Sequence, residues 1–293
     1  MSRVREMRGS PDLALIMVTV IWGGTFLVSQ AALQDGGPYA LLAIRFTIGA
    51  AVLGLFIRTE MGGLTSTELK TGALIGVVTF AAYAFQTVGL QHIPSSRSAF
   101  ITALYVPTVP ILQLLLIKTA PRISAWVGIA VSFAGLIVLS SGEGFTLEFG
   151  TGETLTLAGA LMSALQIVLI SRYAPSSNPL RLAVVQLGVV ALISLAAFGV
   201  TGEALPPPTT RFILAALALG VLGTAVALGT MNWAQQTISA TRATIIYAME
   251  PVWAGLFGAL AGEMLTRPTL IGSSLIVSGV IISEIRWGTT KDE

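Results

Sequence analysis

The chain has no cysteine and a single histidine, and only 10% of its 293 residues are charged. The lack of cysteine excludes disulfide bonds, catalysis by a thiolate and metal sites built from cysteine. The histidine, His92, lies in the short segment LQHIPSSR and has no neighbouring carboxylates that would complete a metal site. Soluble domains usually carry about 25% charged residues, so this composition indicates that most of the chain is not in water.

Three further absences narrow the function. The net charge is only +2 and the chain has no run of basic residues, so no nucleic-acid partner is expected. No G-x-x-x-x-G-K-[ST] segment occurs, which excludes the usual loop that binds ATP phosphates. No serine has the neighbouring base that a nucleophile requires. The sequence therefore predicts a protein that is not an enzyme, needs no cofactor and is not driven directly by ATP.

What the chain has in abundance is apolar sequence: 54% of its residues are hydrophobic. Gly, Pro and charged residues divide the apolar sequence into ten runs. Ten helices of about 20 residues, each long enough to cross a bilayer, account for about 200 residues and leave only short loops. The expected spans are residues 13–33, 38–57, 71–91, 97–117, 123–141, 154–173, 180–200, 212–232, 241–262 and 268–286.

The second half of the chain repeats the pattern of the first. An ungapped overlay of residues 96–140 on 240–284 pairs several residues that shape or pack helices: Pro107 with Pro251, Gly128 with Gly272, and Gly135 with Gly279. Since five is an odd number of crossings, the second unit must be inverted relative to the first. We therefore predict an all-α membrane protein of ten transmembrane helices, arranged as two inverted five-helix repeats, 1–145 and 146–293, around a central cavity.

The paired prolines and glycines carry expectations of their own. Pro107, Pro110 and Pro251 each remove a backbone hydrogen bond and should kink their helices, either to line a cavity or only to allow packing. The paired glycines should let helices approach closely.

Basic residues give the orientation. With the N-terminus inside, most Lys and Arg residues fall on the inner side, and only Arg97, Arg211 and Arg267 fall on the outer side. Because cytoplasmic loops carry the excess of Lys and Arg, we expect a multi-pass protein of the cell (inner) membrane with both termini in the cytoplasm.

Glu250 is the most informative single residue, because it lies inside the ninth run, directly before Pro251. A charge at that depth costs on the order of 2.5–3.5 kcal/mol on insertion scales, so its carboxylate should face protein or water. It is a candidate proton carrier or an anchor for a substrate ammonium group. Alternatively, it pairs with Arg45 or caps backbone groups freed by the proline.

Other polar and aromatic residues in the runs combine flat apolar surface with hydrogen-bonding groups, which is typical of small-molecule sites. The expected substrate-binding residues are Trp22, Tyr83, Gln86, Tyr105, Gln166, Asn232, Trp233, Tyr247 and Glu250. Aromatic residues near span ends, such as Trp233, are also typical of interfacial anchors. Arg45, whose overlay partner is Gln186, is predicted to be a structural polar residue that tethers helices, with binding of a substrate carboxylate as the alternative.

Several segments together resemble one family. They are WGGTFLVSQ (22–30), Ile44-Arg45-Phe46, YAMEPVWAGLFGALAGEMLT (247–266) and IGSSLIVSGVIIS (271–283). They resemble the drug/metabolite transporter superfamily, specifically its ten-helix EamA-like permeases, and within these the aromatic amino acid exporters. The resemblance implies a metabolite permease whose central cavity is lined by spans 1, 3, 4, 6, 8 and 9.

We therefore expect a secondary transporter that exports amino acids, especially aromatic or other apolar ones, by alternating access. The alternative is a multidrug or other metabolite/proton antiporter. Two alternatives from other classes are an intramembrane enzyme and a scaffold that transports nothing. An enzyme would need a buried nucleophile with its base. A scaffold should not be stabilised by any small metabolite. The expected partners are a small-molecule substrate and the lipid bilayer, and the protein is expected to act as a monomer.

Overall fold

A computed structural model describes residues 10–141, 150–260 and 267–284, and within these residues all regular structure is helical. The elements of the first half are α1 (Pro11–Ala32), α2 (Pro38–Phe56), η2 (Met61–Gly63), α3 (Ser66–Gly89), α4 (Ser95–Thr102), α5 (Tyr105–Ile117) and α6 (Ile123–Ser141). Those of the second half are α7 (Thr151–Tyr173), η3 (Ala174–Ser176), α8 (Pro179–Thr201), α9 (Thr210–Leu217), η4 (Ala218–Val226), α10 (Ala227–Ala234), α11 (Ala240–Tyr247), α12 (Glu250–Leu260) and α13 (Arg267–Glu284).

Within the described residues, each expected span coincides with helix, which confirms the all-α membrane fold. By length and composition, six continuous helical stretches can cross a membrane, and there are shorter apolar helices beside them. Spans four and nine are each divided in two, as α4 with α5 and α11 with α12, whereas span eight runs through α9, η4 and α10 and contains a π-helix.

Each of the two divided spans breaks close to the residue that lies four positions before a proline. A proline ring clashes with the carbonyl group four residues earlier and cannot donate a hydrogen bond to it. For Pro107 that residue is Ala103, which lies between α4 and α5; for Pro251 it is Tyr247, the last residue of α11. The expected kinks at these two prolines are confirmed, and Pro110 lies inside α5.

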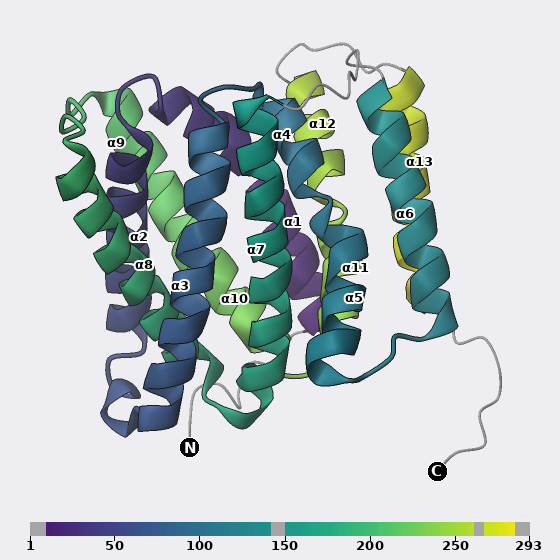
Figure 1. Cartoon of the computed structure of the whole chain (residues 1–293), viewed down its shortest axis with the longest axis horizontal. Coiled ribbons are helices and arrows are strands. Elements are labelled where there is room, and N and C mark those ends of the chain that lie inside the picture. The colour runs from purple at the N-terminus through teal and green to yellow at the C-terminus, as the bar shows by residue number, and fades with distance from the viewer. Residues whose placement is uncertain (1–9, 142–149, 261–266, 285–293) are drawn as a thin grey trace.

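The halves run in opposite directions. In Figure 1, α1 rises from the end of the bundle at which α13 finishes, whereas α7 starts at the other end. The first described helix therefore begins, and the last one finishes, at one end of the bundle, as an even number of crossings requires. Which of the two ends faces the cytoplasm stays a prediction.

The distribution of side chains is the reverse of that in a soluble protein. Large apolar residues such as Leu55, Leu192 and Val200 are 68%, 67% and 88% exposed, whereas Thr79 and Gln186 are fully buried. The bilayer core offers no hydrogen bonds, so polar groups must be satisfied by other protein groups. The exposed apolar faces are therefore the lipid-facing surface.

Helices α6 and α13 pack along one another at one edge of the bundle (Figure 1). A Cβ atom added to Gly128 would lie 2.6 Å from the carbonyl oxygen of Gly279, and one added to Gly135 would lie 2.7 Å from that of Gly272. No side chain fits in these spaces, so the expectation that the paired glycines allow close helix approach is confirmed.

We expect Gly135→Leu to lower the thermal stability of the purified protein in detergent, because the leucine would be forced against the backbone of α13. Overpacking of this kind costs about 1–3 kcal/mol. The matched control is Gly188→Leu on α8, where an added Cβ atom has no neighbour within 4 Å. Equal losses of stability in the two variants, measured by unfolding temperature, would contradict this account.

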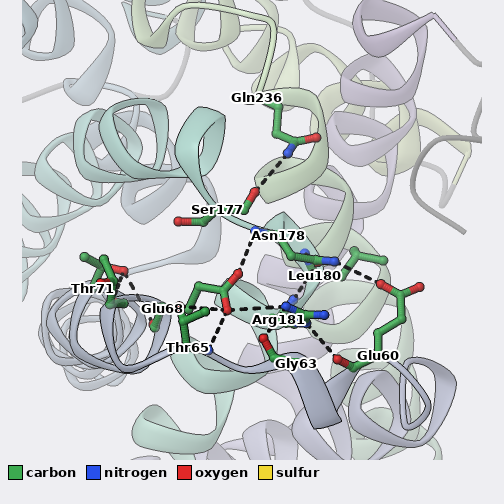
Figure 2. A network of polar contacts seen from close by, with 11 residues as sticks. Glu60, Gly63, Thr65, Glu68, Thr71, Ser177, Asn178, Leu180, Arg181 and Gln236 are labelled. Carbon is green, nitrogen blue, oxygen red and sulfur yellow. Dashed lines mark hydrogen bonds and ion pairs between the residues drawn. The ribbon is translucent and has the colours of Figure 1, made fainter. Parts of the chain in front are cut away.

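At the end of the bundle where α1 begins, residues of the first half hold the start of a helix of the second half (Figure 2). The Glu68 carboxylate accepts a hydrogen bond of 2.9 Å from the backbone N–H of Asn178, just before α8. The Glu60 carboxylate accepts one of 2.9 Å from the Asn178 side chain, and the Glu60 carbonyl accepts one of 2.7 Å from Arg181. The first half thus holds the residue just before α8, whereas the N–H groups of Leu180 and Arg181 are capped by the side chain of Asn178 itself.

At the opposite end, the arrangement is reversed. The Glu203 carboxylate, in the loop before α9, accepts hydrogen bonds from the backbone N–H groups of Ala40 (2.8 Å) and Tyr39 (3.3 Å) in the first turn of α2. Nearby, a hydrogen bond from the Arg211 guanidinium holds the pKa of Asp35 below its usual range. Each half therefore makes hydrogen bonds to the start of the other half's second helix. The boundary expected after residue 145 lies outside the described residues.

Candidate functional site

A cavity lies in the centre of the bundle, where the two divided spans meet α1, α2, α3, α7 and α10. Its volume is about 70 Å³, enough for about two water molecules. The predicted site residues that line it are Trp22, Tyr83, Gln86, Tyr105, Gln166, Tyr247 and Glu250. Their role in binding a substrate stays a prediction, but the fold brings them together from helices that are far apart in the chain.

The predicted residues Asn232 and Trp233 do not line this cavity, and their placement there is corrected. In the eighth span the residues that face the cavity are Leu228 and Met231, so the residues directly after Met231 turn away from it. Asn232 is fully buried and donates a hydrogen bond of 2.9 Å to the side-chain oxygen of Gln186. Trp233 packs in the apolar core with 8% of its surface exposed.

The cavity also has polar lining residues that the sequence did not single out, among them Thr25, Ser29, Thr87, Thr102 and Ser163. Helical spacing could have found some of these. Thr25 and Ser29 follow the predicted Trp22 by three and seven positions, which places all of them on one face of α1. Thr102 and Ser163 had no comparable signal, since small hydroxyl residues are common in spans where they only pack.

Glu250 is the first residue of α12 and is 8% exposed. The break after α11 therefore sets its carboxyl group against the cavity, where the hydroxyl group of Tyr105 is its hydrogen-bond partner. No ion pair within 4.0 Å joins it to Arg45 among the described residues. The proposed pairing of these two residues is therefore wrong, although both line the same cavity.

Aromatic rings make up much of the remaining wall. The rings of Trp22 and Tyr247 lie with their centroids 5.5 Å apart. The ring of Tyr83 lies 4.8 Å from the guanidinium carbon of Arg45, a cation–π contact. The hydroxyl group of Tyr247 is buried and has no hydrogen-bond partner among the described residues. A bound molecule that supplied a partner for this hydroxyl would relieve the cost of leaving it unsatisfied.

A second, more polar pocket of about 470 Å³ lies at the end of the bundle where α5 connects to α6 and α10 to α11, and Arg122 and Arg242 are among its lining residues. Helix α5 carries Tyr105 in the central cavity and Gln113 in this second pocket, eight positions or about 12 Å apart along the helix. The side-chain oxygen of Gln113 accepts hydrogen bonds from the backbone N–H (2.9 Å) and hydroxyl group (3.0 Å) of Thr241. These contacts tie the first half to the second at the wall of this pocket.

The chemistry that the central cavity offers is that of binding. It combines a guanidinium group, a carboxyl group, aromatic surfaces and hydroxyl groups. In the part of the chain that the structure describes, no three His, Cys, Asp or Glu residues are grouped closely enough to hold a metal ion.

Comparison with known proteins supports this picture. The model of the EamA-like transporter family matches twice, over residues 9–141 and 150–284. An uncharacterized transporter of Archaeoglobus fulgidus is 34% identical over 94% of this chain and 86% of its own length. The inner membrane transporter YedA of Escherichia coli K12, also named as uncharacterized, is 28% identical over 92% of this chain and 89% of its own.

A solved crystal structure shares the fold. It aligns with 94% of this chain and 98% of its own, with a TM-score of 0.79 and 22% sequence identity. The family model covers both halves of the chain and the relatives match it over nearly all of its length, and all of them are named as transporters. The chain therefore belongs to the EamA-like transporter family.

Proposed function

We propose that this membrane transporter carries small zwitterionic metabolites, and amino acids in particular. The observation that supports this is the presence of Arg45 and Glu250 in one cavity without an ion pair between them. A buried charge without an opposite charge beside it is costly, so each of these groups gains from a ligand of opposite charge. An α-carboxylate and an α-ammonium group, held close together on one molecule, supply both.

The walls of the cavity suit the rest of an amino acid. Trp22, Tyr83 and Tyr247 offer flat apolar surface, and aromatic pairs add about 0.5–1.5 kcal/mol beyond the burial of area. Aromatic and other apolar side chains are therefore the expected preference, in keeping with the resemblance to aromatic amino acid exporters.

We further propose that transport proceeds by alternating access. The inverted halves, the broken spans at the cavity and a second pocket two helical turns along α5 support this mechanism. A cavity of about 70 Å³ is too small for an aromatic amino acid, so the surrounding helices must move apart when substrate enters. Net flux, which we propose is export, would follow the gradients of substrate and of any coupled proton.

The test is counterflow in proteoliposomes loaded with unlabelled phenylalanine. We expect uptake of labelled phenylalanine to be inhibited at least about tenfold less well by phenethylamine, which lacks the carboxylate, and by 3-phenylpropionate, which lacks the ammonium group, than by phenylalanine itself. The reason is that a hydrogen bond to a charged group contributes about 1.5–3 kcal/mol, and each 1.4 kcal/mol is a factor of ten in affinity.

Protein-free liposomes are the control for passive entry. Exchange of lipophilic cations without exchange of any amino acid would contradict the proposal and favour a multidrug antiporter. Exchange of nucleosides or other neutral metabolites alone would favour a different metabolite permease.

A further inference from the structure

We propose that Thr224, which does not line the cavity, positions Arg45 for binding the substrate carboxylate and thereby sets the preference for carboxylated substrates. Thr224 lies in η4, the π-helical part of the eighth span. The inference deepens the proposed function and rests on it, because it concerns the end of the same cavity that would bind the carboxylate.

Two neighbouring groups of η4 fix the guanidinium group. The Nε atom of Arg45 donates a hydrogen bond of 2.7 Å to the hydroxyl oxygen of Thr224, and its Nη2 atom donates one of 3.2 Å to the carbonyl oxygen of Gly223. A guanidinium group is planar and carries five N–H donors in a fixed fork. Holding the edge formed by Nε and Nη2 therefore fixes the direction of the edge formed by Nη1 and Nη2.

That second edge keeps donors for a ligand. Among the described contacts, Nη1 has no hydrogen bond, and Arg45 is a lining residue of the cavity. The two donors of such an edge match the two oxygens of a carboxylate. The ring of Tyr83 against the guanidinium carbon leaves the plane of the group little freedom to turn.

Close packing of α2 on η4 makes the threonine contact possible. A Cβ atom on Gly49 would lie 2.6 Å from Cγ2 of Thr224, and one on Gly220 would lie 2.7 Å from Cβ of Ile48. The indole nitrogen of Trp22 donates a hydrogen bond of 3.3 Å to the same Gly223 carbonyl oxygen that Arg45 contacts. The π-helical turn thus orients both a cation and an aromatic ring of the cavity, and such turns are frequent at functional sites.

The protein contains a second contact of this kind, in which an uncharged glutamine takes the place of the arginine. Gln186, which follows the first residue of α8 by seven positions as Arg45 follows that of α2, donates a hydrogen bond of 2.8 Å to the hydroxyl oxygen of Thr79 in α3. Its side-chain oxygen accepts a hydrogen bond from Asn232, and neither Gln186 nor Asn232 lines the cavity. A threonine hydroxyl thus tethers the second helix of each half to the third span of the other, but of the two tethered residues Arg45 carries a charge and lines the cavity, whereas Gln186 does neither.

This pair of contacts supplies the experiment. Thr224→Val removes the hydroxyl group and keeps the side-chain shape, and Thr79→Val does the same at the uncharged contact. We expect Thr224→Val to raise the concentration of phenylalanine that half-inhibits counterflow by about tenfold, the effect of one hydrogen bond to a charged group. The concentration of phenethylamine that half-inhibits counterflow should change by less than about twofold, because this compound has no carboxylate for Arg45 to bind. Thr224→Ser keeps the hydroxyl group, so both half-inhibiting concentrations should be those of the wild type. Thr79→Val should leave the ratio of the phenylalanine concentration to the phenethylamine concentration unchanged.

Two results would overturn the inference while leaving the proposed function intact: an equal rise for both compounds in Thr224→Val, or no change for either. If Thr224→Val does not accumulate as folded protein, Thr224→Ala gives the same comparison. A wild-type protein that does not distinguish phenylalanine from phenethylamine would refute the proposed function, and the inference would be overturned with it.

Discussion

Arg45→Gln is expected to weaken the binding of amino acids by about 10- to 100-fold and to leave the protein folded. Glutamine already occupies the equivalent position 186, where it bonds to a threonine hydroxyl, so it can make the corresponding bond to Thr224. It cannot supply the charge that a carboxylate needs. Hydrogen bonds to charged groups contribute about 1.5–3 kcal/mol, and each 1.4 kcal/mol is a factor of ten in affinity.

The measurement is the half-saturating concentration of phenylalanine in counterflow, with unfolding temperature as the check on folding. Phenethylamine serves as the control ligand, because its affinity should be unchanged or improved when the cation is removed. Arg45→Lys should be intermediate, since lysine keeps the charge but lacks the planar fork. Wild-type affinity for phenylalanine in Arg45→Gln would remove Arg45 from the binding site.

Glu250→Gln is expected to abolish the dependence of transport on pH and on an imposed proton gradient. Among the lining residues of the cavity, Glu250 is the one Asp or Glu, so it is the group there that can take up and release a proton. Glutamine keeps the shape and can still bond to the Tyr105 hydroxyl, but it cannot exchange a proton. The same change removes the proposed anchor for the substrate ammonium group, so we also expect weaker binding of amino acids.

Proteoliposomes with and without an imposed proton gradient give the measurement, with the external pH varied across neutrality. The control is Glu153→Gln, because Glu153 is a buried carboxylate of α7 that pairs with Arg97 outside the cavity. That control should keep the wild-type pH profile. A wild-type profile in Glu250→Gln would show that another group carries the proton, and a wild-type protein without any pH dependence would exclude coupling altogether.

The spans and their packing could be predicted from the sequence because they depend on local properties. The length of an apolar run decides whether a helix crosses a bilayer, and proline at 107 or 251 acts on the carbonyl group four residues earlier. Gly128 and Gly135 were recognisable because only glycine leaves room for a neighbouring backbone. The aromatic residues of the cavity followed from their types and from their places in inward-facing spans.

The eighth span shows where this reasoning fails. Nothing in the segment from Ala218 to Val226 marks it as a π-helix, and its close packing against α2 involves residues far away in the sequence. A π-turn accommodates an extra residue, so the residues after it face a different direction from those of a continuous α-helix. Asn232 and Trp233 follow this turn and do not line the cavity; they had been selected by residue type, which says nothing about the direction they face. The contact of Thr224 with Arg45 was missed for a different reason, because the two residues are 179 positions apart.

The exchange of caps between the halves affects how the nascent chain matures. When α2 first enters the bilayer, the N–H groups of Tyr39 and Ala40 are without Glu203, which the ribosome has yet to synthesise. Glu68, in turn, is made before Asn178, whose backbone N–H it will bind. The first half cannot complete the start of α2 by itself, so we expect this helix to reach its final hydrogen bonding only after the loop before α9 has been made.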